Sequence, residues 1–284
     1  MIISNALGFL LGLEGVALLR ASAGDFPDGA AFAEARLAEI RAMLAADQAE
    51  FGEVVELDAL DVNTGYRDWS NRYDEEDNPL IAVEQPVVRS ILETLPVGKA
   101  LDAACGTGRH GQYLVKLGHQ VVGVDGSAEM LALAQDKMPD ARFHLGDINA
   151  MPLASAEFDV VVCALALTHL TELESVFREF HRVLKPGGHL VLSDIHVASL
   201  YLGGIAGATD AEGRPGHLPA SRWLPSHYLQ TALPLGLQVR GCVEPRWGGD
   251  TGHGGPQARR WCPEAATAAY RDTPAAIVWH FQKG

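Results

Sequence analysis

The stretch from Lys99 to Asp125 constrains the fold of this chain more than any other. An apolar run over residues 100–104 ends in a Cys-Gly-Thr-Gly turn, which leads into a helical pattern and then into a second apolar run over 121–124. This order predicts a strand, a glycine loop, a helix and a second strand. Because such a βαβ unit is right-handed with parallel strands, its loops lie at one edge of the sheet. Asp102 and Asp125 are therefore predicted to flank one glycine-lined crevice.

The glycine loop is compatible with two kinds of ligand. Gly106 and Gly108 lack a Cβ, so their backbone can approach a ligand at the N-terminus of the helix. The spacing Gly106-x-Gly108-x-x-Gly111, with Asp125 downstream, also fits a dinucleotide fingerprint. Two like charges about 4 Å apart repel by about 4 kcal/mol at an effective dielectric near 20, so we expect Asp102 to disfavour a pyrophosphate. A ligand that carries an ammonium and a sulfonium would be attracted instead.

Two motifs resemble those of a known family. Asp102-Ala-Ala-Cys-Gly-Thr-Gly108 and Val121-Val-Gly-Val-Asp125 are similar to the first two motifs of class I S-adenosylmethionine (SAM)-dependent methyltransferases. The resemblance runs from about Tyr73 to the C-terminus. Ala104 stands where the family usually has glycine, which should narrow the pocket slightly. The resemblance implies an α/β fold with a Rossmann-like, doubly wound sheet of seven strands, mostly parallel and with an antiparallel C-terminal strand.

The resemblance also implies a set of residues that hold the cofactor SAM, whose product is S-adenosylhomocysteine. These residues are Tyr73, Asp102, Ala104, Cys105, Gly106, Thr107, Gly108, Asp125, Gly126, Met130, Asp147, Ile148 and Ala164. By similarity, Asp102 and the backbone of residues 104–108 would hold the methionine portion, and Asp125 would bind the two ribose hydroxyls.

Three of the remaining roles have simpler alternatives. By similarity, Met130 would pack on the adenine, Asp147 would accept a hydrogen bond from its amino group, Ile148 would cover the ring, and Tyr73 would lie over the amino-acid end. From the residues alone, Met130 could equally fill space in the hydrophobic core. The alternative for Asp147 is an ordinary residue of a solvated turn. Tyr73 shares one helical face with other aromatic residues, a pattern that is also typical of a core.

The acceptor site is predicted at the ends of two further strands. Residues 157–166 form a continuous apolar run, as in a central strand buried on both faces, and residues 189–195 form the next strand. The fourth strand lies beside the first at the topological switch point, where ligands bind in open sheets, so its exit over residues 165–170 is the expected floor of the site. The substrate-site candidates are Leu167, His169, Asp194, His196, Tyr201 and Trp223. His169 and His196 are the candidate catalytic bases, since an unperturbed imidazole has a pKa of about 6.5, and a structural role is the alternative for each.

The rest of the chain is assigned by pattern. The pattern of residues 1–60 predicts a helical extension outside the methyltransferase domain, which is assigned to residues 61–284. The simpler interpretation is that this extension covers the sheet, and the alternative is that it forms a dimer surface or a substrate lid. Residues 196–223 are glycine-rich and lack periodicity, which favours a substrate lid. Strands are predicted over 237–244 and 275–282, with no clear helix pattern between them.

Composition argues against several function classes. A net charge of −14 disfavours a nucleic-acid partner, because phosphates require clustered Lys and Arg. The four cysteines lack a C-x-x-C spacing, so we expect no metal site and a reducing cytoplasm. The apolar residues 6–19 follow no basic residue and are shorter than the roughly 20 residues that span a bilayer, so no membrane association is expected.

The leading hypothesis is a SAM-dependent methyltransferase that modifies an O or N atom of a small, partly apolar molecule, as a monomer or a homodimer. Methyl transfer from a sulfonium is an in-line displacement, which requires positioning more than a metal or a strong acid. The alternatives are a SAM-binding protein that transfers no methyl group and an NAD(P)-dependent oxidoreductase. The choice of O or N over C rests on the frequency of these reactions in the family.

Overall fold

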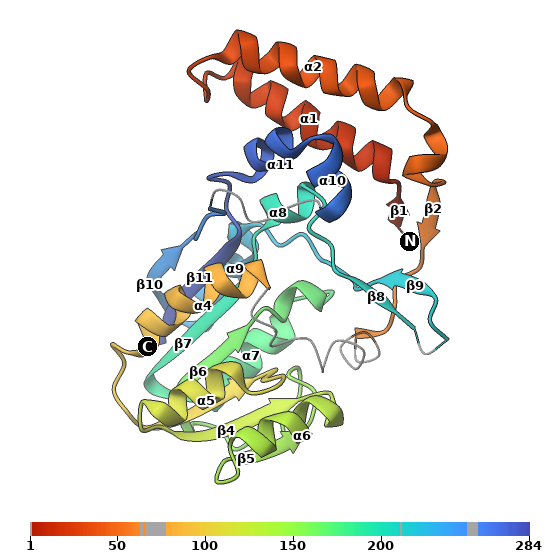
Figure 1. Cartoon of the computed structure of the whole chain (residues 1–284). Helices are drawn as coiled ribbons and strands as arrows, with labels where there is room; N and C mark the ends of the chain where they lie inside the picture. The colour runs from red at the N-terminus through yellow and green to blue at the C-terminus, as the bar shows by residue number, and fades with distance from the viewer. Residues whose placement is uncertain (1, 63–64, 66–77, 211, 249–254) are drawn as a thin grey trace.

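The computed structural model describes residues 2–62, 65, 78–210, 212–248 and 255–284. Its centre is a seven-stranded sheet in the order β10-β11-β7-β6-β3-β4-β5 (Figure 1). The strands are β3 (Lys99–Ala103), β4 (Gln120–Asp125), β5 (Arg142–Leu145), β6 (Phe158–Ala164), β7 (Leu184–Ile195), β10 (Leu237–Val243) and β11 (Ala276–Lys283). β11 is antiparallel to both neighbours, and the strands from β5 to β7 pair in parallel. The predicted mostly parallel sheet with an antiparallel C-terminal strand is confirmed.

Helices cover both faces of this sheet. They are α4 (Pro79–Leu92), α5 (Arg109–Lys116), α6 (Ala128–Lys137), α7 (Glu174–Val183) and α9 (Pro225–Ala232). Side chains alternate along β3, so Ala100 packs in one core with Val88 of α4, and Leu101 packs in the opposite core with Phe177 of α7. Burial on both faces explains why the central strands are continuously apolar.

A second hydrophobic core joins the N-terminal extension to residues near the C-terminus. The elements that build it are α1 (Ala6–Ser22), α2 (Gly29–Ala45), η1 (Gln48–Phe51), α10 (Gly255–Trp261) and α11 (Pro263–Tyr270), which we call the helical unit. Two short strands, β1 (Ile2–Ser4) and β2 (Val55–Leu57), pair beside it. Figure 1 shows α1 and α2 stacked on α11, beyond the end of the sheet. Among the described residues, no helix has the length and apolar character to cross a bilayer.

This arrangement corrects the expectation of a helical cover on the sheet. The extension is helical as predicted, but it packs on α10 and α11, which are inserted between β10 and β11. The insertion shows no clear sequence pattern because alanines supply most of its buried contacts: Ala265, Ala266, Ala268 and Ala269 are all buried in α11.

The helical unit encloses a cluster of charged side chains. Arg36 of α2 is 1% exposed, and its guanidinium contacts Glu39 at 2.9 Å, Glu264 of α11 at 3.0 Å and the fully buried Glu14 of α1 at 3.3 Å. Three carboxylates thus share one cation. Burial, followed by the hydrogen bond and charge of Glu39, raises the pKa of Glu14 to about 8. A protonated Glu14 brings the charges of the cluster closer to balance.

The raised pKa of Glu14 makes the stability of the helical unit depend on pH. Because the folded-state pKa lies above the ordinary value of 4.5, the contribution of Glu14 is fully present below pH 4.5 and is lost as the pH rises through about 8. Glutamine has the same shape and stays neutral, so Glu14→Gln is expected to match the wild type at about pH 5 and to be more stable at about pH 9. Denaturant unfolding at both pH values measures the difference in stability. A variant that is less stable than the wild type at both pH values would contradict the raised pKa of Glu14.

Residues 196–223, for which the sequence favours a substrate lid, contain α8 (Val197–Tyr201) and a hairpin of β8 (Gly207–Thr209) and β9 (Pro215–His217). The helical unit anchors its start, because the Tyr270 hydroxyl donates to the Leu202 carbonyl at 2.7 Å. The hairpin pairs with the chain that follows β2, where Leu60 N donates to His217 O at 2.9 Å. The segment therefore runs from the helical unit to the carboxyl edge of the sheet.

Candidate functional site

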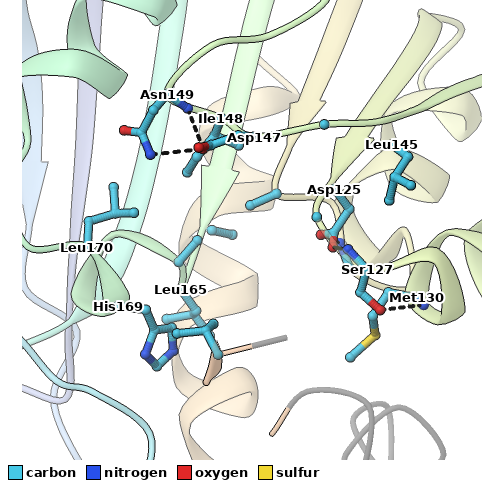
Figure 2. A pocket seen from close by; sticks show the side chains of 17 residues that line it. Asp125, Ser127, Met130, Leu145, Asp147, Ile148, Asn149, Leu165, His169 and Leu170 are labelled. Carbon is cyan, nitrogen blue, oxygen red and sulfur yellow. Dashed lines mark hydrogen bonds between the residues drawn. The ribbon is translucent and has the colours of Figure 1, made fainter. Parts of the chain in front are cut away.

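A cavity of about 530 Å³ lies at the carboxyl ends of β3, β4, β5 and β6 (Figure 2). Its volume falls in the range of about 300–1,000 Å³ that is typical of small-molecule sites. Nine predicted residues line it: Ala104, Gly106, Asp125, Gly126, Met130, Asp147, Ile148, Ala164 and His169. The loops after four parallel strands therefore converge on one hollow, as the topology of the sheet requires.

The loop after β3 presents backbone to this cavity. Gly106 has φ +53°, and a Cβ built on it would meet no atom within 4 Å, so its open side faces the hollow. Ala104 also has a positive φ, +52°, where a residue with a Cβ costs roughly 1–2 kcal/mol. This strain is the physical reason why glycine suits the position better than alanine.

Asp125, at the end of β4, lines the cavity and is held in place by backbone amides. Its Oδ2 accepts a hydrogen bond from Gly106 N at 2.7 Å and its Oδ1 accepts one from Ser127 N at 2.9 Å. Burial raises the pKa of Asp125, and the backbone amides of Ser127, Gly106 and Gly126 oppose that rise. The two oxygens of a carboxylate offer about four lone pairs, so these bonds leave capacity for ligand hydroxyls.

Asp102 does not face the cavity, which corrects the prediction of two acids flanking one crevice. It is 3% exposed, and its Oδ2 accepts a hydrogen bond from Gly111 N at 2.6 Å. Alternation along β3 places Asp102 on the same side as Ala100, toward α5. Burial raises the pKa of Asp102 to about 7. Its carboxylate therefore secures the first turn of α5 from behind the loop.

The second and third glycines of the fingerprint serve helix packing. A Cβ on Gly108 would collide with the Met138 methyl, and one on Gly111 would lie 3.1 Å from the same atom. Both positions thus let α5 approach the end of α6. The spacing that resembles a dinucleotide motif is explained here by packing at two of its three positions.

Apolar and polar side chains share the lining of the cavity. Met130 and Ile148, which are 2% and 8% exposed, line it together with Leu145, and Figure 2 shows Ile148 beside Asp147 and Asn149. Asp147 is exposed, and its Oδ1 accepts hydrogen bonds from Asn149 N at 2.8 Å and Asn149 Nδ2 at 2.9 Å. Such a lining suits a flat ring that carries hydrogen-bonding groups at its edge.

His169 lines the cavity from the short helix η2 (Leu167–His169), which follows β6. Its Nδ1 is 2.7 Å from the Pro219 carbonyl oxygen. Because a carbonyl only accepts, Nδ1 carries the proton, and Nε2 of the neutral ring is an acceptor. Burial lowers the pKa of His169, opposed by the bond to Pro219. A neutral imidazole of this kind is competent to act as a base.

Several predicted residues lie elsewhere. Cys105, Thr107 and Gly108 are buried within the loop, and Leu167 is in the core. Tyr73 lies outside the described residues. Tyr201 is 68% exposed on α8, and the Trp223 indole donates to the Leu167 carbonyl at 2.9 Å.

His196 and Asp194, which were predicted at the substrate site, have structural partners instead. His196 caps α8, because its Nδ1 accepts from Ala198 N at 3.1 Å while Nε2 lies 3.1 Å from Glu244 Oε1. Asp194 is 1% exposed and bonds to the Tyr228 hydroxyl at 2.9 Å. Of the two histidine candidates, the structure therefore brings only His169 to the cavity.

Eight residues that line the cavity were not among the individually predicted site residues. They are Val62, Ser127, Leu145, Gly146, Asn149, Leu165, Ala166 and Leu170. Most follow strand ends directly, so the topology was the available signal, and the last three lie in the predicted floor over 165–170. Val62 comes from the chain after β2, where no sequence pattern indicates a cavity residue.

Comparison with known proteins gives a consistent result. A family model described as a methyltransferase domain matches residues 101–192. Demethylmenaquinone methyltransferase of Chlorobaculum parvum is 44% identical over 91 residues, which are 32% of this chain and 38% of that protein. Malonyl-[acyl-carrier protein] O-methyltransferase of Erwinia billingiae is 35% identical over 144 residues, which are 49% of this chain and 55% of that protein. The chain thus spans about half or less of these relatives.

The fold has solved counterparts as well. The crystal structure of an S-adenosylmethionine-dependent methyltransferase from Mesorhizobium loti superposes with a TM-score of 0.53 and 26% identity, covering 71% of this chain and 98% of that one. The matched segment 101–192 contains the glycine loop, Asp125 and His169. Motifs, strand order and similarity agree that residues 101–192 belong to a methyltransferase domain and that the sheet has the fold of SAM-dependent methyltransferases.

Proposed function

We propose that this chain transfers the methyl group of SAM to an oxygen or nitrogen atom of a small, partly apolar molecule. The observation that carries the proposal is that one cavity combines Asp125 at one end with His169 at the other. The O-methyltransferase among the similar proteins supports an oxygen acceptor. Because the matches cover only part of those relatives, the activity of the whole protein is our inference.

The residues of the cavity fit SAM. Gly106 offers open backbone for the methionine portion, since a side chain there would project into the hollow. Asp125 would accept hydrogen bonds from the ribose hydroxyls, and Met130 with Ile148 would enclose the adenine. Asp147 would accept a bond from the amino group at the edge of that ring. The roles proposed for these four side chains are the same as those that the sequence resemblance implies.

The protein's contribution to catalysis is mainly positioning. When bound, SAM supplies a methyl group that its sulfonium already activates. Leu165, Ala166 and Leu170 line the same cavity as His169, so they offer apolar surface to an acceptor bound near it. Alignment of the reacting atoms can supply about 7–11 kcal/mol of the barrier reduction. Nε2 of His169 would take the proton that the acceptor hydroxyl or amine loses as its lone pair attacks the methyl carbon. Such general-base catalysis raises the rate by a further factor of about 10²–10⁴.

Replacement of His169 separates catalysis from cofactor binding. His169→Ala is expected to lower turnover by about 10²-fold or more, because the base is lost, while SAM affinity changes by less than about threefold. Labelled methyl transfer and calorimetry measure the two quantities. A large loss of SAM binding with normal turnover at saturation would contradict the role.

The matched control for this experiment is His196→Asn. Asparagine is a favourable N-cap, so the variant keeps the start of α8 while removing the other candidate histidine. We expect turnover close to that of the wild type. A loss as large as that of His169→Ala would return His196 to the substrate site.

The acceptor is identified most directly by mass spectrometry of a small-metabolite library incubated with the protein and methyl-labelled SAM. We expect a labelled product from an apolar molecule with a hydroxyl or amine. If SAM binds but no acceptor in a broad library is labelled, the chain binds SAM without transferring its methyl group.

A further inference from the structure

We propose that residues 219–223, which we call the strap, hold the candidate base in place, with Ser221 and Trp223 as the positioning residues. The inference rests on the proposed function, in which His169 takes the proton of the acceptor. It assigns the strap a role through its hydrogen bonds to η2 and to the His169 ring, rather than through contact with the acceptor.

The turn that carries the base is too short to fix its own position. It contains hydrogen bonds from His169 N to Ala166 O at 3.1 Å and from Leu170 N to Leu167 O at 3.0 Å. A short 3₁₀ turn leaves carbonyl groups at its end that need partners from elsewhere. Just upstream, Leu165 has φ +55°, a strained conformation that persists only where surrounding contacts fix it. The position of His169 therefore depends on contacts from outside the turn.

The strap supplies hydrogen-bond donors to the carbonyl groups of this turn. Ser221 N donates to Thr168 O at 2.7 Å, and Ser221 Oγ donates to Leu170 O at 2.5 Å. The Trp223 indole N–H donates to Leu167 O at 2.9 Å. Because backbone carbonyls removed from water require partners, these three bonds join the strap and the turn.

The strap also orients the imidazole of the base. His169 Nδ1 donates to the carbonyl of Pro219, the first residue of the strap, at 2.7 Å. The hydrogen bond at one ring nitrogen decides which nitrogen of a neutral imidazole carries the proton. The backbone that Ser221 and Trp223 hold against η2 therefore also keeps Nε2 as the acceptor nitrogen. A displacement of the base by about 1 Å is sufficient to cost about 10²-fold in rate.

Both ends of the strap are themselves fixed. Leu218, which precedes the strap, is fully buried, and its backbone N–H donates to Ala206 O at 2.9 Å. Trp223 packs against the core under α7, and its ring lies edge-on to that of His227 with 5.6 Å between the centroids. The bonds from the strap to η2 therefore hold the base relative to the rest of the fold.

Two substitutions each remove one donor of the strap and keep most of its bulk. Trp223→Phe deletes the indole N–H, and Ser221→Ala deletes the hydroxyl. We expect each to lower kcat by about fivefold to tenfold and both together to lower it by about 10²-fold, with SAM affinity within about threefold of the wild type.

Two further variants serve as controls. Ser221→Thr keeps the hydroxyl and should retain most of the wild-type kcat. Arg222 lies between the two positioning residues, but its exposed side chain contacts the Tyr201 ring, with 5.6 Å from the guanidinium to the centroid. Arg222→Ala should therefore leave kcat unchanged. A loss in Arg222→Ala as large as that in Ser221→Ala would overturn the assignment of the positioning residues.

Combination with His169→Ala separates positioning from a general loss of stability. If the strap acts through His169, the two substitutions together cost less than about twofold once the imidazole is gone, because effects on one catalytic unit are not additive. An equal loss in both backgrounds, or a parallel loss of SAM binding, would overturn the proposal. If the protein with both substitutions does not fold, Trp223→Phe alone gives the same comparison.

The protonation of the His169 ring tests the strap without any activity. At about pH 8 this ring is neutral, because burial lowers the pKa of His169 below its ordinary value of 6.5. Nitrogen-15 NMR then distinguishes the two neutral forms of the imidazole, and the His169 signal is identified by its loss in His169→Ala. We expect the wild type to carry the proton on Nδ1, and Ser221→Ala with Trp223→Phe to raise the share of the Nε2–H form by about fivefold.

The outcomes separate this inference from the proposed function. An unchanged ratio of the two ring forms in the protein with both substitutions would overturn the positioning role. If the wild type transfers no methyl group but the ring responds as expected, the proposed function fails while the hold of the strap on His169 stands.

Discussion

Replacement of Asp125 by alanine is expected to weaken SAM binding by about 100-fold or more. Two hydrogen bonds from ribose hydroxyls to a carboxylate would be lost, each worth about 1.5–3 kcal/mol, and every 1.4 kcal/mol is tenfold in affinity. The variant also frees Gly106 N and Ser127 N, which Asp125 holds in the free protein. Isothermal titration with SAM measures the change.

The control for this prediction is Asp147→Ala. Asp147 is exposed at the rim of the same cavity, and its loss removes one proposed contact with the adenine, so we expect a loss of roughly tenfold. Circular dichroism of both variants verifies that each is folded. Unchanged SAM affinity in a folded Asp125→Ala protein would remove Asp125 from the ribose role.

Replacement of Arg36 by alanine is expected to lower the free energy of unfolding of the helical unit by about 3–5 kcal/mol. Removal of one partner from a buried ion pair leaves an uncompensated charge in the interior, which accounts for an effect of this size. Here the loss leaves Glu14, Glu39 and Glu264 around the vacated position without their shared cation. Denaturant unfolding followed by the fluorescence of Trp247 and Trp261, which belong to or contact this core, measures it.

An exposed ion pair in the same unit supplies the comparison. Arg260 contacts Glu50 at 2.6 Å, but its side chain is 63% exposed. Exposed pairs contribute about 0–1 kcal/mol, so Arg260→Ala is expected to have a small effect. A change for Arg36→Ala no larger than that for Arg260→Ala would show that the buried cluster does not hold the helical unit together.

The sheet was predictable because its signals are local. Apolar runs bounded by glycine loops gave β3, β4 and β6, and Ser127 caps α6 through Met130 N at 3.2 Å as expected from its type. The cavity followed from topology, since parallel strands bring Asp125 and His169 to one edge.

The predictions that were wrong concern residues whose position depends on the direction of a side chain or on a contact with a distant part of the chain. Asp102 is one residue from the loop, yet strand alternation turns it away from the hollow. His196 follows β7 directly, but Ala198 N and Glu244 engage both of its nitrogens. The packing of the N-terminal helices on α10 and α11 joins opposite ends of the chain through small alanines, which leave no periodic pattern.

The hollow beside β3, β4 and β6 is expected to hold SAM or its product S-adenosylhomocysteine rather than a dinucleotide. Isothermal titration of the wild-type protein, with S-adenosylhomocysteine and separately with NADH, tests this expectation most directly. We expect one equivalent of S-adenosylhomocysteine to bind, with NADH giving no saturable heat. Saturable binding of NADH, with none for S-adenosylhomocysteine, would contradict it.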